Sequence, residues 1–407
     1  FLAMISPTFG VIVLARMIQA AGSAVMMPLL MNVVLTVFPV ERRGTAMGFI
    51  GLVMFMAPAI GPTLSGWIIE HYSWRALFLI VLPFAVFTLI YAIFRLRNVT
   101  PNRDIKLDVQ SLMLSSIAFG GLLYGFSSAG EYGWSSFYVY GTIIIGAVFL
   151  IVFIMRQNKM ENPMLDFKIY KYPMFALSSA ISIVLSMSMF SGMILTPLYV
   201  QTVRDISPFH SGILMLPGAI VMGLMSPITG RLFDRYGART MAVIGLSIVV
   251  VTTFYLSRLT MDIGYYELMV IYTIRMFGIS MVSMPVMTNG LNQLPMESNP
   301  HGTAINSTLQ QISGAIGSAF LLTLMTKRME TSGVKLYEEA MAKGNIPNAT
   351  SDLAMFEQQL KDLAMLDGIN YAFFIATCLA FLSLVLAFFI KRVTPPPILK
   401  PTTDQDR

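Results

Sequence analysis

The sequence contains few charged residues, one cysteine and three histidines. Charged residues make up 12% of the 407 residues and hydrophobic residues 56%, whereas an average soluble domain is about 25% charged. The single cysteine, Cys378, excludes an intrachain disulfide and a paired-thiol metal site. The three histidines have no spacing typical of metal ligands, and no phosphate-binding glycine loop or nucleophile constellation is present. These absences argue against a soluble enzyme, a metal site and direct use of ATP.

Long apolar segments fill most of the chain, and the mean hydropathy is +0.70. Segments of about 20 apolar residues are long enough to cross a hydrocarbon core about 30 Å thick. We therefore predict an all-α, polytopic membrane protein with a helix stub at residues 1–7. Complete spans are predicted at residues 9–37, 45–70, 74–94, 108–128, 136–155, 173–203, 208–230, 239–258, 265–293, 301–326 and 369–391.

Lysine and arginine accumulate in alternate loops between the predicted spans, as they do on the cytoplasmic side of membrane proteins. This distribution predicts a cytoplasmic C-terminus, including the tail at residues 394–407. The one long loop, at residues 327–367, is predicted to face outside, and helical apolar spacing predicts an interfacial or capping helix at residues 352–366. The net charge of +6 reflects this bias rather than nucleic-acid binding.

A pattern of residues occurs twice, about 257 residues apart, as expected of an internal duplication. The first copy contains Arg16, Asn32, Gly44-Thr45-Ala46 and Ala59-Ile60-Gly61, and the second contains Arg275, Asn289, Gly302-Thr303-Ala304 and Ala315-Ile316-Gly317. The interval holds an even number of predicted spans, so both copies have the same orientation. Parallel repeats are a known design of secondary transporters, with the substrate site between the halves.

The basic turn at residues 230–239 has no partner in the first copy, because the repeat offset places that partner before Phe1. We therefore expect the sequence to be truncated at its N-terminus by about 85 residues, enough for two helices and most of a third. Restoring these residues gives about fourteen helices.

Two further patterns lie in the predicted spans. The first combines Arg16 with Gln19 and Gly22, and a charge within the membrane is a functional candidate by default. The second is the small-residue stretch that contains Gly61, Pro62 and Gly66. Small residues let helices approach closely, and proline removes a backbone donor and permits a bend.

Taken together, these patterns resemble the major facilitator superfamily, and within it the fourteen-helix drug:proton antiporters of the EmrB/QacA type. The resemblance implies two parallel six-helix repeats plus two inserted helices, here without the first two helices and most of the third. Residues 1–94 would be the remainder of the N-terminal bundle, residues 95–160 the inserted helices with their flanks, and residues 161–393 the C-terminal bundle.

The resemblance also implies roles for residues, each with a structural alternative. Proton coupling and gating fall to Arg16, Gln19, Gly22 and Arg275, where the alternative is an arginine that binds backbone carbonyls or a neighbouring helix. The antiporter helix motif comprises Gly61, Pro62 and Gly66, where the alternative is ordinary close packing. A cytoplasmic latch loop comprises Gly230, Asp234, Arg235, Gly237 and Arg239, where the alternative is a tight basic turn.

No aspartate or glutamate lies deep within a predicted span. A proton antiporter needs a group that changes charge, and arginine does not lose its proton. The resemblance implies an acidic residue in the first helix, outside this sequence. No cofactor is expected, and the proton is the expected coupling ion.

The predicted function is secondary active transport by alternating access, with no enzymatic activity. Proton-coupled export of drugs or toxic amphipathic compounds is the first hypothesis. The alternatives are a carrier of one specific small metabolite, which includes an importer, and a membrane sensor or scaffold that transports nothing. The candidate residues of the substrate cavity are Asn32, Met189, Tyr199, Asn289, Gln310 and Gln311. The alternative is that these side chains pack between helices or face lipid.

The expected partners are small hydrophobic or cationic substrates, the lipid bilayer and accessory export proteins. The protein is expected to be monomeric and to reside in the cell membrane.

Overall fold

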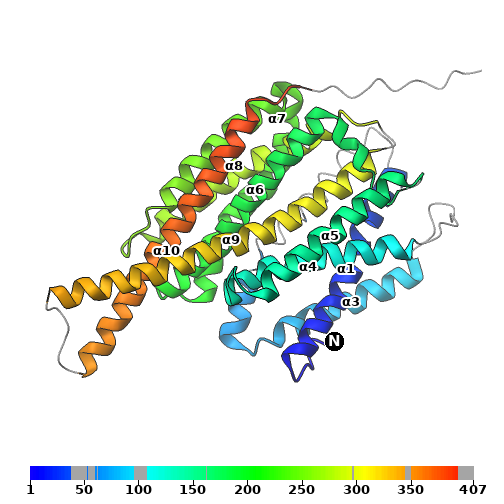
Figure 1. The fold of residues 1–407 in the computed structure, drawn as a ribbon. Coiled ribbons are helices and arrows are strands. Elements are labelled where there is room, and N and C mark those ends of the chain that lie inside the picture. Colours follow the sequence, from blue (N-terminus) through cyan, green and yellow to red (C-terminus); the bar gives the residue numbers. More distant parts are fainter. Residues whose placement is uncertain are drawn as a thin grey trace, which may run out of the picture. The chain divides into compact units, whose positions relative to one another are not determined.

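In the residues that it describes, the computed structural model of the chain has helices as its regular secondary structure, joined by turns and short connections (Figure 1). It describes residues 1–37, 53, 60–61, 63–95, 108–161, 163–295, 298–343 and 350–392. The long helices are α1 (Phe9–Val37), α3 (Ala76–Arg95), α4 (Val109–Tyr132), α5 (Phe137–Lys159), α6 (Pro173–Leu198), α7 (Pro208–Leu256), α8 (Tyr265–Leu291), α9 (Asn299–Ala342) and α10 (Thr350–Ala387). A 3₁₀ turn, η1 (Phe167–Lys171), precedes α6, and a π-helical turn, η2 (Tyr199–Val203), follows it. Residues 63–71 are also helical.

Ten helical segments in the described part of the chain are long and apolar enough to cross a membrane. They correspond to all the predicted spans except residues 45–70, most of which lie outside the described residues. Helices suit this environment because every backbone polar group inside the helix is satisfied within its own segment. The prediction of an all-α, multi-pass membrane protein is confirmed.

The chain divides into two compact units. The first comprises Phe1–Leu107, Asp205–Pro227 and Tyr265–Thr273, and the second comprises Asp108–Arg204, Ile228–Gly264 and Ile274–Arg407. Helices α4 and α5, predicted as an insertion, belong to the second unit, where α4 packs against both α5 and α9. The predicted boundaries at residues 94 and 160 stay predictions.

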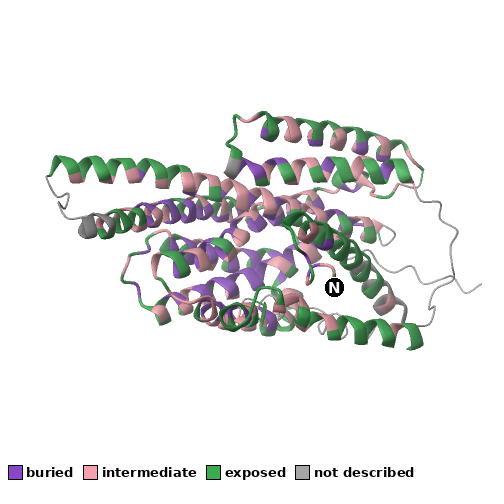
Figure 2. Ribbon diagram, turned by 90° about the horizontal axis from the view of Figure 1, so that it is seen from below, coloured by how far each residue is buried: buried purple, intermediate pink, exposed green. Residues whose placement is uncertain are grey.

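The second unit has an apolar core shared by α6, α7, α8 and α10. Small alanines on α7 and α10 let the larger side chains of α6 and α8 pack closely, and Figure 2 shows buried residues running along the helices that pack together. The core residues are Ile181, Leu185, Ala238, Ala242, Leu246, Val282, Val286, Ala387 and Ile390. This core joins the helices that carry Arg275 and the predicted latch residues.

Helix α7 contains a sharp break where the sequence predicts a loop. Helix α7 contains two segments that are each long and apolar enough to cross a membrane, Pro208–Phe233 and Arg235–Leu256. The break is at Gly237, whose φ of 79° and ψ of 166° are not helical. These angles are essentially restricted to glycine, so one residue makes the turn that was predicted to occupy residues 230–239.

The long loop predicted at residues 327–367 is largely helical in the structure, which corrects the sequence analysis. Helix α9 continues to Ala342, and α10 already begins at Thr350, so the predicted capping helix at residues 352–366 is the first part of α10. The two segments form a helical hairpin that extends beyond the neighbouring helices of its unit (Figure 1). Helices α9 and α10 remain helical where the sequence becomes polar, because this polar segment is rich in residues with high helix propensity.

Candidate functional site

The second unit contains a buried arginine, Arg275, on α8. Its side chain is 0% exposed. Its Nε donates a hydrogen bond to Thr253 Oγ1 on α7 at 3.1 Å, and its Nη2 donates to the carbonyl oxygen of Ser188 on α6 at 2.7 Å. A single guanidinium therefore links three helices, and it does so at the position that the repeat pairs with Arg16.

A glycine on α6, Gly192, makes room for this guanidinium. A Cβ atom added to Gly192 would lie 2.0 Å from Arg275 Nη1 and 2.6 Å from Cζ. No real Cβ approaches other atoms so closely, so either the arginine or the backbone of α6 would have to move. Sequence analysis did not identify Gly192, because the residue that it accommodates lies 83 positions further along the chain.

Arg16, on α1 in the first unit, has a different environment from Arg275. Its side chain is exposed, and Nη1 donates a hydrogen bond to Gln19 Oε1 at 2.8 Å, one helical turn away. Gly22 lies on the same helix, with no atom within 4 Å of an added Cβ. The structure thus joins Arg16 to one of its two predicted partners.

The antiporter helix motif is partly described, because Pro62 lies outside the described residues. Gly66 lies against the start of α7, where an added Cβ would be 2.6 Å from the carbonyl oxygen of Pro208. Gly61 has no atom within 4 Å of such a Cβ. Close approach of two backbones therefore requires glycine at residue 66, while the described residues impose no such requirement at residue 61.

The predicted latch residues lie around the break in α7. Gly237 is buried, and its Cα faces the side chain of Arg392 just beyond α10, with 3.6 Å between an added Cβ and Arg392 Cδ. The guanidinium of Arg235 lies 5.3 Å from the ring centroid of Tyr236. Arg239 is exposed, nothing lies within 4 Å of a Cβ on Gly230, and the side chain of Asp234 is outside the described set.

Two predicted cavity residues bind backbone at helix ends. Asn289 on α8 is 0% exposed and donates from Nδ2 to the carbonyl oxygen of Lys391 at 3.0 Å. Tyr199 is also 0% exposed, and its hydroxyl donates to the carbonyl oxygen of Thr260 in the α7–α8 connection at 2.5 Å. Both contacts tie connections to helices, as the packing alternative expects.

The other cavity candidates do not form a cluster among the described residues. Met189 on α6 and Gln310 on α9 are half-buried, and Gln311 on α9 is exposed. The side chain of Asn32 lies outside the described residues. Among the residues that the structure describes, no group of three histidine, cysteine or acidic side chains is placed to hold a metal ion.

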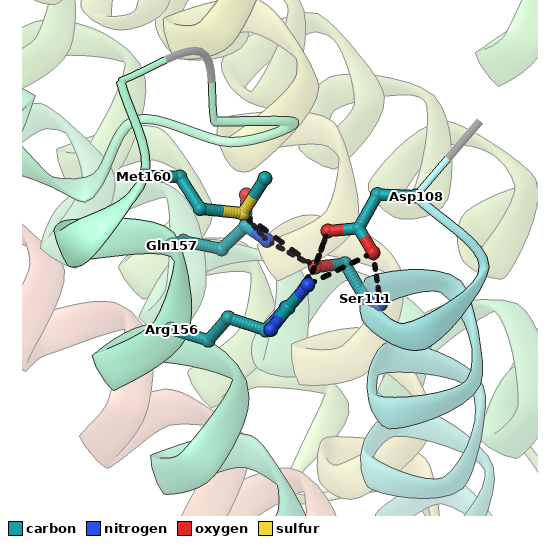
Figure 3. A network of polar contacts seen from close by, with 5 residues as sticks. All are labelled: Asp108, Ser111, Arg156, Gln157 and Met160. Atoms are coloured by element: carbon teal, nitrogen blue, oxygen red, sulfur yellow. Dashed lines mark hydrogen bonds and ion pairs between the residues drawn. The ribbon is translucent and has the colours of Figure 1, made fainter. Parts of the chain in front are cut away.

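A polar network at one end of α4 and α5 was not predicted (Figure 3). The carboxylate of Asp108 accepts from Arg156 Nη2 at 3.1 and 3.2 Å and from Ser111 Oγ at 2.5 Å, and its Oδ1 accepts the Ser111 backbone N–H at 3.2 Å. Gln157 Nε2 also donates to Ser111 Oγ, and Gln157 Oε1 accepts the N–H of Leu165. The network joins both helices to the segment that leads into α6.

The same contacts perturb the acidity of Asp108. Hydrogen bonds from Ser111 and Arg156 lower the pKa of its carboxyl from 3.8 to about 2. In the sequence, Asp108 marked only the end of a span. Its position directly before a helix, where aspartate commonly caps the first turn, is the signal from which a capping role could have been predicted.

Comparisons with known proteins agree with this architecture. Residues 1–318 match the Major Facilitator Superfamily. The chain is 42% identical to an uncharacterised MFS-type transporter, YcnB of Bacillus subtilis, over 97% of this chain and 79% of the relative. It is also 42% identical to the lincomycin resistance protein LmrB of Listeria monocytogenes, over 96% of this chain and 79% of the relative.

The fold is also similar to that of a solved transporter. The crystal structure of a bacterial homolog of the human lysosomal transporter Spinster matches with a TM-score of 0.56, at 16% identity, over 95% of this chain and 78% of that chain. At this identity the likeness concerns the fold alone. The chain is thus a membrane transporter rather than an enzyme, and it belongs to the Major Facilitator Superfamily.

Proposed function

We propose that this transporter exports drugs or other toxic amphipathic compounds in exchange for protons. The observation that carries the proposal is the 42% identity to a lincomycin resistance protein along 96% of the chain. The close approach of Gly66 to Pro208 adds to it, because the resemblance associates the motif of Gly61, Pro62 and Gly66 with antiport.

The proposed architecture is the fourteen-helix arrangement of two parallel six-helix repeats and two inserted helices. The even number of spans between the two copies of the repeat supports it, as does the pairing of α4 with α5. The proposed location is the cell membrane, with the C-terminus and the turn at Gly237 on the cytoplasmic side. The lysine and arginine distribution supports this orientation.

In the proposed mechanism, the arginines act as fixed charges. Arginine keeps its proton at physiological pH, so Arg275 and Arg16 cannot carry protons. Arg275 instead holds α6, α7 and α8 in register through Ser188 and Thr253. A separate acidic group takes up and releases the coupling proton, and Arg16 with Gln19 responds to that change in charge.

Efflux from cells tests the proposal. Cells that produce the full-length protein are loaded with ethidium, and its loss is followed with and without a protonophore. We expect export above that of cells with empty vector, and collapse of the export when the proton gradient is removed. Export that continues unchanged after gradient collapse would contradict proton coupling, and no export of any tested drug would favour the metabolite carrier.

A substitution of Arg16 tests whether this residue takes part in transport or has only a structural role. We expect Arg16→Ala to abolish efflux while the amount of protein in the membrane stays the same. The matched control is Arg258→Ala, because Arg258 lies over the ring of Phe254 at a helix end, with 5.1 Å between Cζ and the ring centroid. Efflux retained in Arg16→Ala would show that this arginine is structural.

A further inference from the structure

The helical hairpin formed by the end of α9 and the start of α10 contains a groove. The groove has a volume of about 630 Å³ and lies where the two helices converge. Pockets for drug-sized ligands typically measure roughly 300 to 1,000 Å³. The groove belongs entirely to the second unit, and it lies in the segment predicted to face outside.

Apolar, adaptable side chains form part of the lining of the groove, and we refer to them as the apolar wall. Met329 and Tyr337 line it from α9, and Leu360 and Met365 line it from α10. Methionine side chains adjust to irregular ligands, and an aromatic face attracts cations. Gly333 leaves space in this wall, because an added Cβ would touch only Ala364 Cβ, at 3.7 Å.

The lining of the groove also carries more negative than positive charge. Glu357 and Asp362 line it together with one lysine, Lys361. Residues 327–367 contain seven acidic and five basic residues, although the whole chain has a net charge of +6. The hairpin is therefore opposite in charge to the chain as a whole.

Two basic residues of the hairpin outside the groove, Arg328 and Lys343, make contacts elsewhere. Arg328 Nε donates to Asp367 Oδ2 at 2.7 Å, and Arg328 Cζ lies 5.6 Å from the ring centroid of Tyr371. Ser332 also donates to Asp367, so this cluster ties the two helices together beside the groove. Lys343 pairs with Glu339 at 3.9 Å. These contacts hold two positive charges at positions that do not line the groove.

We propose that the groove binds an amphipathic organic cation. The apolar wall accommodates its hydrocarbon body, and Glu357 and Asp362 attract its charge. The site is additional to any cavity between the membrane helices. We assign the groove a role in export, as a binding site for the cation on the outer side of the membrane. This role rests on the proposed function.

The direct test is binding of tetraphenylphosphonium to the purified full-length protein. Tyr337→Trp preserves the aromatic wall and places a fluorescent reporter in the groove, and the protein with Tyr337 provides the background from the three native tryptophans. We expect saturable quenching by tetraphenylphosphonium, weakened by added salt because the carboxylates are partly exposed. Triphenylphosphine oxide, which is neutral and of similar shape, is expected to bind more weakly.

Charge variants make the test specific. In the Tyr337→Trp background, Glu357→Gln with Asp362→Asn is expected to weaken binding about fivefold to tenfold, since each partly exposed charge pair contributes at most about 1 kcal/mol. The control, Glu330→Gln with Glu338→Gln, removes the same charge from exposed positions of the hairpin that do not line the groove, and is expected to bind like the parent. Gly333→Leu fills the groove and is expected to abolish the signal.

Equal weakening in both pairs of variants would overturn the proposal, as would quenching that persists in Gly333→Leu. The absence of quenching from the reporter would overturn it as well. Because binding is measured without transport, failure of ethidium efflux together with specific binding would reject only the export function. Successful efflux without binding at the reporter would reject only the groove.

Discussion

Arg275 and Gly192 are matched to each other, because the guanidinium occupies the space that a side chain on Gly192 would need. We predict that Gly192→Ala lowers the free energy of unfolding by about 1 to 3 kcal/mol, the usual range for overpacking a core. Thermal unfolding of the purified protein measures the effect. The control is Gly120→Ala in α4, where nothing lies within 4 Å of the added atom.

The control has its own expected sign. Alanine is a better helix former than glycine by about 0.5 to 1 kcal/mol, so Gly120→Ala is expected to be neutral or stabilising. If Gly192→Ala unfolds at the same temperature as Gly120→Ala, then the guanidinium of Arg275 does not depend on the space at Gly192.

The two glycines of the predicted latch also differ. We predict that Gly237→Ala destabilises the protein by about 1 to 3 kcal/mol, because its backbone angles are restricted to glycine. Gly230→Ala is expected to be tolerated, since nothing lies within 4 Å of its added Cβ. Thermal unfolding of both variants in parallel decides the matter, and an equal loss in both would contradict the account of the break in α7.

The sequence identified Arg275 but not its surroundings. A lone arginine within an apolar segment is conspicuous, and the repeat drew attention to its position. Gly192, Ser188 and Thr253 are ordinary residues of membrane helices, and only the packing of α6 and α7 against α8 brings them to the guanidinium. Contacts of this kind depend on the rotation of each helix about its axis, which hydropathy does not determine.

At the scale of elements, the network at Asp108 joins α4 to α5. The lowered pKa of Asp108 means that folding favours its charged form. The contact therefore stabilises the fold fully above the ordinary pKa of 3.8, and its contribution is lost as the pH falls through about 2.

A pH series on a variant tests this contribution. We predict that Asp108→Asn unfolds at a lower temperature than the wild type above about pH 4, and that the difference shrinks as the pH approaches about 2. Glu339→Gln, which removes an exposed carboxylate, is the control and is expected to have little effect. A difference between Asp108→Asn and the wild type that does not change with pH would show that ionisation is not involved.

The hairpin of α9 and α10 shows where prediction from hydropathy fails for whole elements. The apolar spans were located well, because membrane thickness sets their length. The polar continuation of α9 to Ala342 was assigned to a loop, because a drop in hydropathy marks the membrane boundary and not the end of a helix. The prediction at residues 352–366 succeeded because it used helical spacing instead.

At the scale of the whole molecule, sequence and structure agree on a multi-pass transporter of the Major Facilitator Superfamily. Low charge and long apolar runs predicted the membrane class, and the repeat with its local patterns predicted the family. The proton-carrying residue could not be named, because no acidic residue lies deep within a predicted span. Exchange of drug for protons is consequently the central claim that remains to be measured.

The most direct measurement uses the full-length protein in proteoliposomes that contain a pH-sensitive dye and hold an imposed pH gradient. Addition of a transported drug is predicted to discharge the gradient faster than in liposomes without protein, and Arg16→Ala is predicted to abolish the difference. A gradient that is unaffected while radiolabelled drug still crosses the membrane would contradict proton-coupled export.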